Sequence, residues 1–579
     1  MKNRWLLRPV SQPEVVARLR QELNDLPEAL ARTLVLREVT TFEGARLFFR
    51  PLLEHLHDPF LMKDMDAAAD RVVQALNRGE RILVYGDYDV DGTTSTALMT
   101  TFLREMGAEV QYFIPDRFRD GYGLGKTGID YAVEIGAALI VALDCGITAH
   151  EEARYVRSCG LDLVICDHHT ALETIPDAVA VLDPKRPDCA YPFKELCGCG
   201  VGFKLVQAVL ARLGEAPERA LPYLDLVALA TASDIVPVNG ENRVLLREGM
   251  TRLKKEARLG LRALAAEARV DLDQCTTQQI VFGLGPRINA AGRLGDAGRA
   301  VDLMMATDEA VAQKLAQQLE QVNLKRRALD QETLDEAVAM AERQLGDHTR
   351  HTLVLHNPAW HIGVIGIVAS RLVERFYRPT ILMSTVNGYA KGSARSINGI
   401  NIYQALQACQ DLLVQFGGHN YAAGVTLMEA DVPAFQKQFD DVVSASVTPD
   451  VLDPVIEVDA HLNLADIDTR FWKVLQQFAP FGPANDTPVF QGQDLEVVGE
   501  PRLVGRDGAH LKFAVRQRGV YSSGLDVIGF RMQHHLPTLL DSIQHGTPFE
   551  LLFSVEENTW NGRITLQLRA RDLRTGQSR

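Results

Sequence analysis

Aspartate and histidine side chains follow three apolar stretches of the sequence. They are Asp87, Asp89 and Asp91 after RILVYG, Asp144 after ALIVAL, and Asp167, His168 and His169 after LDLVIC. Carboxylates that pack together without cations repel one another and raise one another's pKa values. Aspartate mixed with histidine suits Mn²⁺ or Mg²⁺ better than zinc, which more often recruits cysteine. The spacing therefore indicates a site for divalent metal ions.

The number of candidate ligands is sufficient for two ions. Asp234, which ends the later apolar run in ALATASDIVP, is a candidate for the same site. Two metal ions about 3.5–4 Å apart are the standard arrangement for displacement at phosphorus, where one activates water and both stabilise the developing charge. The predicted chemistry is hydrolysis of a phosphate ester.

Each motif alone has a simpler interpretation. A single aspartate at the end of a strand is often the N-cap of a helix. DYDVDG could be a calcium-like loop, although it lacks the later glutamate of an EF-hand. A lone pair of histidines is more often structural, and Cys197 and Cys199 have no second pair at zinc spacing. Only the joint occurrence of the motifs on successive strands favours a metal site.

The elements that must position these groups are short, β-branched apolar runs between residues 81 and 184, separated by helical stretches. Buried strands that alternate with helices predict an α/β fold with a doubly wound parallel sheet. Ligands of such sheets bind at the carboxyl ends of the strands. All the candidate ligands would then converge on one edge.

We expect five segments along the chain: an N-terminal helical segment over 1–75, the parallel-sheet domain over 76–300, connecting helices over 301–350, a second α/β domain over 351–447, and an OB-like β-barrel over 455–575. Residues 300–345 contain no Gly or Pro and repeat apolar residues at helical spacing. They predict one or two long helices that bridge two domains. An ordinary helical hairpin of the first domain is the alternative.

Composition sets further limits. The 579 residues are 46% hydrophobic and 23% charged, as in ordinary globular proteins. No apolar run reaches the ~18 residues of a membrane span, and the N-terminus has too few apolar residues for a signal peptide, so we expect a cytoplasmic protein without membrane association. The net charge of −14 is not typical of a nucleic-acid binder. Residues 501–579, however, hold 11 Lys and Arg against 7 Asp and Glu, a local excess that a solvated basic face would also explain.

Four ordered motifs, GDYDVDGTTS, LDCGIT, CDHH and ATASDIVP, resemble those of the DHH phosphoesterases. PDRFRDGYGL, PRINAAGRLG, GSARS, FGGHNYAAG and PFGPANDTPVF resemble, in the same order, motifs of the single-strand-specific exonucleases of that family, and together they cover nearly the whole chain. One departure is Asp486 in the last motif, where proline is expected. It is expected to lie far from the metals.

The resemblance implies a 5′-to-3′ exonuclease that releases 5′-mononucleotides from single-stranded DNA with Mn²⁺ or Mg²⁺, in DNA repair and recombination. Single-strand-binding protein and a RecQ-like helicase are the protein partners it suggests. The alternative is a phosphoesterase of short oligonucleotides or small nucleotides, whose family members are shorter and lack the barrel. A non-catalytic scaffold should have lost ligands, whereas every motif ligand is present here.

The resemblance also implies roles for single residues. One metal would take Asp89 and Asp144 with help from Asp87, and the other would take Asp91, Asp144, His168 and Asp234. Asp144 would bridge the two ions. Asp167 would orient a histidine, and His169 would face the scissile phosphate as a donor.

Candidate substrate-binding residues lie outside this ligand set. They are Arg117, Arg119, Tyr122, Arg287, Asn289, Arg293, Ser393, Arg395 and His419. Arginine suits bidentate phosphate contacts, and His419 follows two glycines that let the backbone reach a ligand closely. Tyr122, between two glycines, could stack on a base or simply pack in a turn.

Ser393 and Arg395 stand two residues apart, so in an extended segment both point to the same side and could hold the 5′-terminal phosphate, with room left by Gly392. A surface ion pair is the simpler interpretation of Arg395. In the tail, basic residues interleave with aromatic ones, as in OB-folds that bind single strands, although the aromatics could equally be core. This set is Arg502, Arg506, Lys512, Arg516, Arg518, Phe513 and Tyr521.

Overall fold

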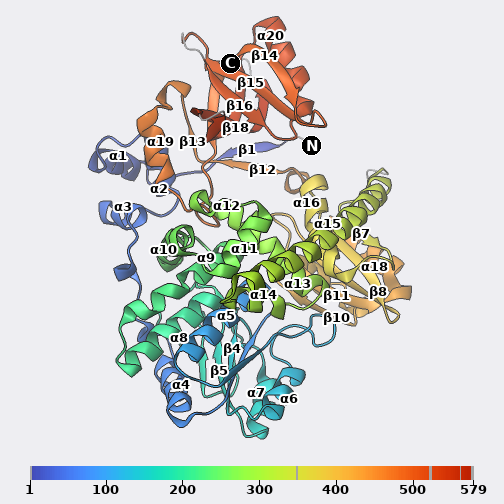
Figure 1. Cartoon of the computed structure of the whole chain (residues 1–579). Coiled ribbons are helices and arrows are strands. Elements are labelled where there is room, and N and C mark those ends of the chain that lie inside the picture. Colours follow the sequence, from blue (N-terminus) through green and yellow to red (C-terminus); the bar gives the residue numbers. More distant parts are fainter. Residues whose placement is uncertain (1–2, 347–349, 521–523, 561–562, 576–579) are drawn as a thin grey trace. The chain divides into compact units, whose positions relative to one another are not determined.

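The computed structural model describes residues 3–346, 350–520, 524–560 and 563–575. The chain forms two compact units (Figure 1). The first comprises Leu53–Val236 and Gly240–Pro454. The second comprises the N-terminal segment up to Leu52, the short stretch Pro237–Asn239 and the chain from Val455 onward.

A five-stranded parallel sheet forms the centre of the first half of the first unit. Its order is β3 (Val110–Phe113), β2 (Ile82–Gly86), β4 (Leu139–Leu143), β5 (Asp162–Cys166) and β6 (Ala180–Leu182). Residues of β2, β4 and β5 are almost all buried, as expected for strands covered on both faces. The predicted doubly wound sheet is confirmed.

Helices cover both faces of this sheet. The helices α6 (Lys126–Glu134) and α7 (His150–Ser158) pack on one face, where Ile129 and Val156 share a core with Leu83 and Ile140. The helices α4 (Met65–Arg78), α5 (Val90–Glu105) and α8 (Gly198–Leu213) pack against one another and against the strands. Helix α9 (Leu224–Ser233) lies against α5 and α8 and carries Asp234 at its C-terminus.

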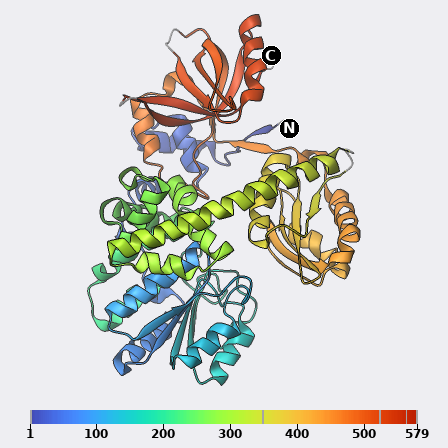
Figure 2. The ribbon, with the colours of Figure 1, turned by 45° about the vertical axis from the view of Figure 1, so that its right-hand side comes forward.

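The prediction of a long helix is confirmed. Helix α15 (Glu309–Leu345) is one continuous helix of 37 residues, visible as a single yellow-green ribbon in Figure 2. At about 1.5 Å per residue it is about 55 Å long. It begins at Asp308, whose side chain accepts a hydrogen bond from the Val311 N–H, and it packs against α11 (Leu259–Ala268), α13 (Gly285–Leu294) and α16 (Ile362–Phe376). The helical hairpin considered as an alternative is therefore wrong.

The second half of this unit is built on another five-stranded sheet. Its order is β10 (Gln415–Gly418), β11 (Ala422–Met428), β9 (Tyr389–Arg395), β8 (Thr380–Val386) and β7 (Leu353–His356). Helix α16 covers β8 and β9 on one face and shares a core with β7 and β8 that includes Leu382. Helix α18 (Val432–Ser446) covers the other face, where Met383 and Ala394 pack against Phe435.

The second unit contains a six-stranded sheet that closes into a β-barrel, as the sequence predicts. Its strands are β13 (Ala460–His461), β14 (Phe490–Val504), β15 (His510–Gln517), β16 (Leu525–Gly529), β17 (Phe549–Trp560) and β18 (Arg563–Thr575). Pairing of β14 with β17 closes the sheet on itself. Strand closure removes the exposed edges that an open sheet would present.

The N-terminal segment belongs to the barrel unit. Strand β1 (Arg4–Leu7) pairs in parallel with β12 (Val455–Val458). The helices α1 (Pro13–Glu22), α2 (Glu28–Val35) and α3 (Phe42–Phe49) contribute to the same hydrophobic core as the barrel. In the part of the chain that the structure describes, no helix is long and apolar enough to cross a membrane.

Candidate metal centre and substrate cavity

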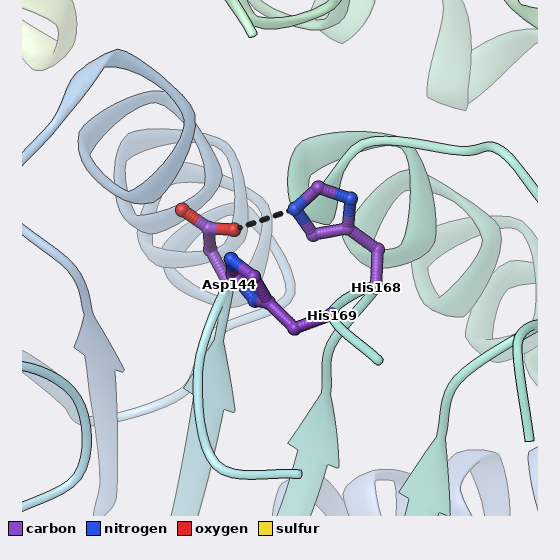
Figure 3. A group of neighbouring side chains, drawn as sticks. All are labelled: Asp144, His168 and His169. Atoms are coloured by element: carbon purple, nitrogen blue, oxygen red, sulfur yellow. Dashed lines mark ion pairs between the residues drawn. The ribbon is translucent and has the colours of Figure 1, made fainter. Parts of the chain in front are cut away.

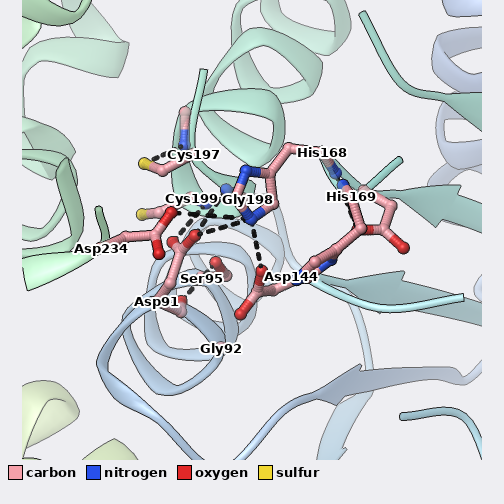
Figure 4. A network of polar contacts seen from close by, with 12 residues as sticks. Asp91, Gly92, Ser95, Asp144, His168, His169, Cys197, Gly198, Cys199 and Asp234 are labelled. Carbon is pink, nitrogen blue, oxygen red and sulfur yellow. Dashed lines mark hydrogen bonds and ion pairs between the residues drawn. The ribbon is translucent and has the colours of Figure 1, made fainter. Parts of the chain in front are cut away.

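The carboxyl ends of β2, β4 and β5 bring the predicted ligands together. His168 Nε2 lies 3.2 Å from Asp144 Oδ1 and 3.7 Å from both Asp91 Oδ2 and Asp234 Oδ2. Figure 3 shows Asp144, His168 and His169 at adjacent strand ends. Figure 4 shows Asp91 and Asp234 facing the same imidazole from two helices.

Tight turns after β2 and β4 aim these carboxylates. Asp89 caps helix α5 and accepts a hydrogen bond from the Gly92 N–H at 3.0 Å. A Cβ on Gly92 would lie 2.4 Å from the Asp87 carbonyl oxygen, so only glycine allows this turn. Asp144 has a φ of +61°, a left-handed conformation that aspartate tolerates better than most residues. A Cβ on Gly198 would meet the Asp144 side chain at 2.7 Å.

The N-terminus of helix α8 holds Asp91. The carboxylate accepts hydrogen bonds from the Gly198 N–H at 2.6 Å and the Cys199 N–H at 2.7 Å. Backbone donors at a helix N-terminus favour a negative charge. The motif CGCG around Cys197 therefore positions a ligand aspartate, a role that the sequence analysis did not recognise. The four small residues at the start of this apolar helix were the feature of the sequence that could have indicated this role.

Asp167 and His169 form a charged pair that adjoins Asp144 and His168 of the cluster. Asp167 accepts hydrogen bonds from the Ile147 N–H at 2.8 Å and the His168 N–H at 2.7 Å, and its Oδ1 lies 2.7 Å from His169 Nδ1. Burial works against ionisation of both groups, but their mutual hydrogen bond and attraction outweigh it. The pKa of Asp167 falls to about 2 and that of His169 rises to about 9. His169 Nε2 lies 3.2 Å from the Tyr122 hydroxyl.

The remaining carboxylates repel one another. Burial raises the pKa values of four aspartates, and neighbouring carboxylates add to the shift. They are Asp87, Asp89, Asp91 and Asp144. Burial also lowers the pKa of His168 to about 4, so this imidazole is neutral at pH 7 and can serve as a ligand.

The donor set fits divalent cations. Buried oxygens of Asp87, Asp144 and Asp234 have no hydrogen-bond partner among the described residues. Donor atoms within 4.8 Å of one another form one group of Asp87, Asp89 and Asp144, another of Asp91, His168 and Asp234, and a third of Asp144, His168 and His169 that overlaps both. Unpaired buried carboxylate oxygens are costly unless a cation or a donor satisfies them. The first two groups resemble the two predicted ligand sets, although the individual ligand assignments remain predictions.

A cavity of about 730 Å³ lies in the same unit and is lined by both α/β halves. Five of the predicted substrate residues line it: Arg117, Tyr122, Arg293, Ser393 and Arg395. Tyr122 contacts His169 and so connects the cavity with the carboxylate cluster. None of the described residues that line the cavity is acidic. The cavity therefore suits an anionic ligand.

The other four candidates lie elsewhere. Arg119 is exposed and pairs with Asp120 at 3.1 Å. The Arg287 guanidinium contacts Glu320 at 2.6 Å and the Gly283 carbonyl oxygen. Asn289 accepts a hydrogen bond from the Val90 N–H at 3.1 Å and so positions the start of α5.

His419 is exposed in the turn between β10 and β11, where its N–H donates to the Ala422 carbonyl oxygen. For these four residues the structure shows positioning or surface contacts. Their substrate-binding role remains a prediction.

Ser393 and Arg395 point to the same side of β9, as predicted, and Arg395 donates a hydrogen bond to Ser393 Oγ at 2.8 Å. The proposed role of Gly392 is wrong, because its Cβ position faces the core side chains of Met383 and Val425 at 2.6 and 2.9 Å. Gly366 of α16 provides the close approach instead, since a Cβ there would lie 2.9 Å from Ser393 Oγ.

In the barrel, Phe513 is a core residue, which was the alternative left open by the sequence. Arg516 contacts Glu496 at 2.5 Å, and Tyr521 lies outside the described residues. Among the described residues of the barrel, Phe530 is an exposed aromatic side chain that the sequence pattern did not indicate. The Arg569 guanidinium lies 5.1 Å from its ring centre, and the His510 ring lies 5.2 Å away.

Fold and site together define a metal-dependent phosphoesterase of the DHH class. Three known domain families match successive parts of the chain: the N-terminal domain of the DHH family over residues 81–231, the DHHA1 domain over 350–445 and the RecJ OB domain over 458–572. These matches confirm the predicted order of a DHH domain, a DHH-associated domain and an OB-fold.

Relatives identify the family within this class. The chain is 39% identical to the single-stranded-DNA-specific exonuclease RecJ of Bacillus subtilis, over 99% of this chain and 71% of that protein. It is 37% identical to RecJ of Dickeya dadantii, over 94% and 96%. The crystal structure of RecJ in complex with Mn²⁺ from Thermus thermophilus superposes with a TM-score of 0.83 at 31% identity, over 99% of this chain and 80% of that one. The chain belongs to the RecJ family of single-stranded-DNA-specific exonucleases.

Proposed function

We propose that this protein hydrolyses single-stranded DNA from its 5′ end and releases 5′-mononucleotides, using two Mn²⁺ or Mg²⁺ ions, in DNA repair and recombination. One observation carries the proposal: a cluster of buried carboxylates with unpaired oxygens lies next to a basic cavity without acidic lining. The names of the RecJ relatives and the Mn²⁺ and Mg²⁺ complexes of the Thermus thermophilus protein support it. The 5′-to-3′ polarity rests on the family resemblance.

The carboxylate cluster would hold the metal ions. Asp87, Asp89 and Asp144 would hold one ion, and Asp91, His168 and Asp234 would hold the other, because the donor atoms of each group lie within 4.8 Å of one another. Asp144 Oδ1 lies 3.2 Å from His168 Nε2 of the second group, so Asp144 would contribute to both ligand sets. When bound, the two ions would supply an activated water molecule and neutralise charge at phosphorus.

His169 would contact the scissile phosphate. Its pKa of about 9 keeps the imidazole protonated at neutral pH, so it can donate a charge-assisted hydrogen bond to a non-bridging oxygen. Asp167 fixes the ring through Nδ1 and leaves Nε2 facing the cavity beside Tyr122. Hydrolysis breaks the bond from phosphorus to the 3′ oxygen of the first nucleotide. The proton of the attacking water then ends on the released 3′-hydroxyl, and the phosphate stays on the shortened strand.

The 5′-terminal phosphate would bind to Ser393, Arg395 and Arg293. Removal from solvent lowers the pKa of Arg293 to about 10, and the nearby guanidinium groups of Arg117 and Arg395 add to the shift. These cations lie close together without a carboxylate among the cavity-lining residues. A terminal phosphate carries nearly two negative charges and three acceptor oxygens, and it would relieve this repulsion.

Single-strand selectivity would come from the cavity and from the barrel. The cavity takes lining residues from both α/β halves and would admit one strand, whereas a duplex is about twice as wide. The barrel offers Phe530 with flanking basic groups for base stacking. By resemblance we also propose single-strand-binding protein and a RecQ-like helicase as partners. We also propose a cytoplasmic location, because the RecJ relatives are bacterial proteins and bacterial DNA lies in the cytoplasm.

The decisive experiment follows product size from a single-stranded oligonucleotide that carries a 5′ label. With Mn²⁺ or Mg²⁺ the labelled product should be a mononucleotide from the first turnover, and EDTA should stop the reaction. A label at the 3′ end should instead give a ladder of shortening strands. Cleavage only of oligonucleotides a few residues long would favour the alternative of a small-substrate phosphoesterase.

A further inference from the structure

The substrate cavity extends beyond the Ser393–Arg395 pair along the sheet. The register of β9, β11 and β10 places side chains of one face in rows across the strands. Ser393 lies opposite Gly424, which lies opposite Gly417, and the next row on this face is Lys391, Thr426 and Gln415. Residues of both rows line the cavity.

The part of the cavity that lies over β11 and β10 is not filled by side chains of the sheet. Helix α16 packs over β8 and β9, where Leu382 lies in the shared core, and no comparable packing against β10 or β11 is found among the described residues. A Cβ built on Gly417 or Gly424 would meet no heavy atom within 4 Å. Neither glycine has a positive φ, so backbone strain does not explain the residue type. The missing side chains leave space above the edge strand β10 and its neighbour β11.

The second row, which we call the outer row, consists of Lys391, Thr426 and Gln415 and has side chains suited to bind a phosphate. Lys391 and Gln415 are exposed, Thr426 is half-buried, and all three line the cavity. Lysine supplies a point charge, while the amide and the hydroxyl supply neutral donors. With no acidic residue among the described lining, this row would attract an anion rather than form an internal ion pair.

The spacing of the two rows fits one nucleotide. Lys391 and Ser393 are two residues apart on β9, or about 6.6–6.8 Å along an extended strand. This is close to the separation of successive phosphates in an extended single strand, and much longer than that within a pyrophosphate. The open positions of Gly424 and Gly417, in the row of Ser393, would leave room for the sugar between two such phosphates.

We propose that Lys391, Thr426 and Gln415 form a second backbone-phosphate subsite, one nucleotide beyond the 5′-terminal site, which lets the enzyme hold a strand shifted by one nucleotide and release a dinucleotide. This inference rests on the proposed function. In the shifted strand the terminal phosphate occupies the outer row and the first internucleotide phosphate occupies the Ser393–Arg395 site. Water then adds to the second internucleotide phosphorus, the bond to the 3′ oxygen breaks, and that oxygen takes the proton.

A blocked substrate tests the proposal. Two 5′-phosphorylated single strands of one sequence are compared, one natural and one with a methylene group in place of the 3′ oxygen of its first linkage. The substitution keeps the charge of that linkage and removes the bond that hydrolysis must break. The natural strand should yield mononucleotides. The blocked strand should yield a 5′ dinucleotide first, at a lower rate.

Substitutions in the second phosphate subsite test whether dinucleotide release depends on it. Lys391→Ala and Gln415→Ala should each lower the rate of dinucleotide release relative to mononucleotide release, by about tenfold or more for the lysine, the usual effect of a lost charge-assisted contact. Lys437→Ala, at an exposed lysine of α18 in the same half of the unit, should leave the ratio unchanged.

Two results would overturn the proposal: a blocked strand that survives while the natural strand is degraded, or a ratio that Lys391→Ala and Gln415→Ala both leave unchanged. A natural strand that is not degraded would contradict the proposed function instead.

Discussion

His169 Nδ1 lies 2.7 Å from Asp167 Oδ1, and through His169 this pair adjoins the candidate metal ligands Asp144 and His168. The contact keeps the histidine protonated while burial holds the adjacent His168 neutral. Two neighbouring imidazoles thus differ in charge at pH 7. One is suited to donate to a phosphate and the other to bind a metal ion.

The first prediction concerns this pair. Asp167→Asn should let the pKa of His169 fall from about 9 toward its ordinary value near 6.5, because the negative charge is lost while an acceptor oxygen remains. The alkaline limb of the pH–rate profile with Mg²⁺ should move toward neutral pH accordingly. His169→Asn should lower the rate at every pH and serves as the reference. An alkaline limb that stays in place would show that His169 does not act as the charged donor.

The same pair predicts a pH-dependent contribution to the free energy of unfolding. The raised pKa of His169 stabilises the fold fully below about pH 6.5, and this contribution is lost as pH rises through about 9. The lowered pKa of Asp167 stabilises it above about pH 4, and this part is lost as pH falls through about 2. Urea titrations between pH 6 and 10 should show a smaller pH dependence in Asp167→Asn than in the parent.

The second prediction concerns metal dependence. Asp144→Asn should reduce cleavage by several orders of magnitude, because an amide cannot replace a charged ligand. Asparagine is the cleaner substitution, since it tolerates the left-handed backbone at φ +61° better than alanine. Without metal, the variant should melt at an equal or higher temperature, because one repelling carboxylate is gone. Mn²⁺ should stabilise the parent more than the variant. Near-normal turnover of Asp144→Asn, or of the parent in EDTA, would contradict the two-metal site.

The third prediction concerns the 5′ end. Arg395→Ala should slow cleavage of 5′-phosphorylated strands about 10- to 150-fold, and 5′-hydroxyl strands much less, because a charge-assisted contact to the terminal phosphate is lost. Arg375→Ala, an exposed arginine of α16 that pairs with Glu342, is the matched control. Equal slowing of both substrates would remove Arg395 from the terminal-phosphate site.

The fourth prediction concerns the barrel. Deleting residues 456–579 would also remove core contacts of the N-terminal helices, so a surface change is the cleaner test. Phe530→Ala should weaken binding of long single strands about 5- to 150-fold, the usual value of one stacked base. Leu540→Ala, at an exposed leucine of α20 (Leu536–His545), should bind normally. Fluorescence anisotropy with labelled oligonucleotides measures both, and unchanged affinity in Phe530→Ala would exclude this residue as a stacking platform.

The fifth prediction concerns strand selectivity. Blunt duplex DNA should resist degradation, and a 5′ single-stranded tail should restore it, because one strand must enter the cavity between the two α/β halves. A duplex with a 3′ tail of the same length controls for end fraying and should remain largely intact. Equal rates on blunt duplex and single strand would contradict a cavity that admits one strand.

The sequence by itself determined the sheet and the location of the metal cluster. Short β-branched runs that alternate with helices form parallel strands, and the carboxyl ends of such strands share one edge. Asp87, Asp144 and Asp167 each follow a strand, so their meeting follows from local pattern and sheet geometry alone. The long helix over 309–345 could also be predicted from the sequence, because neither glycine nor proline interrupts its apolar periodicity.

Only the tertiary structure decided which residues far apart in the chain meet. The N-terminus of α8 binds Asp91, Asn289 positions α5, and Arg287 contacts Glu320. Phe513 lies in the barrel core while Phe530 lies on the surface. Periodicity reports which side of an element is buried, but a contact between two elements depends on how they pack. That packing is set by shape complementarity and close approach over the whole core, a property that no local stretch of sequence contains.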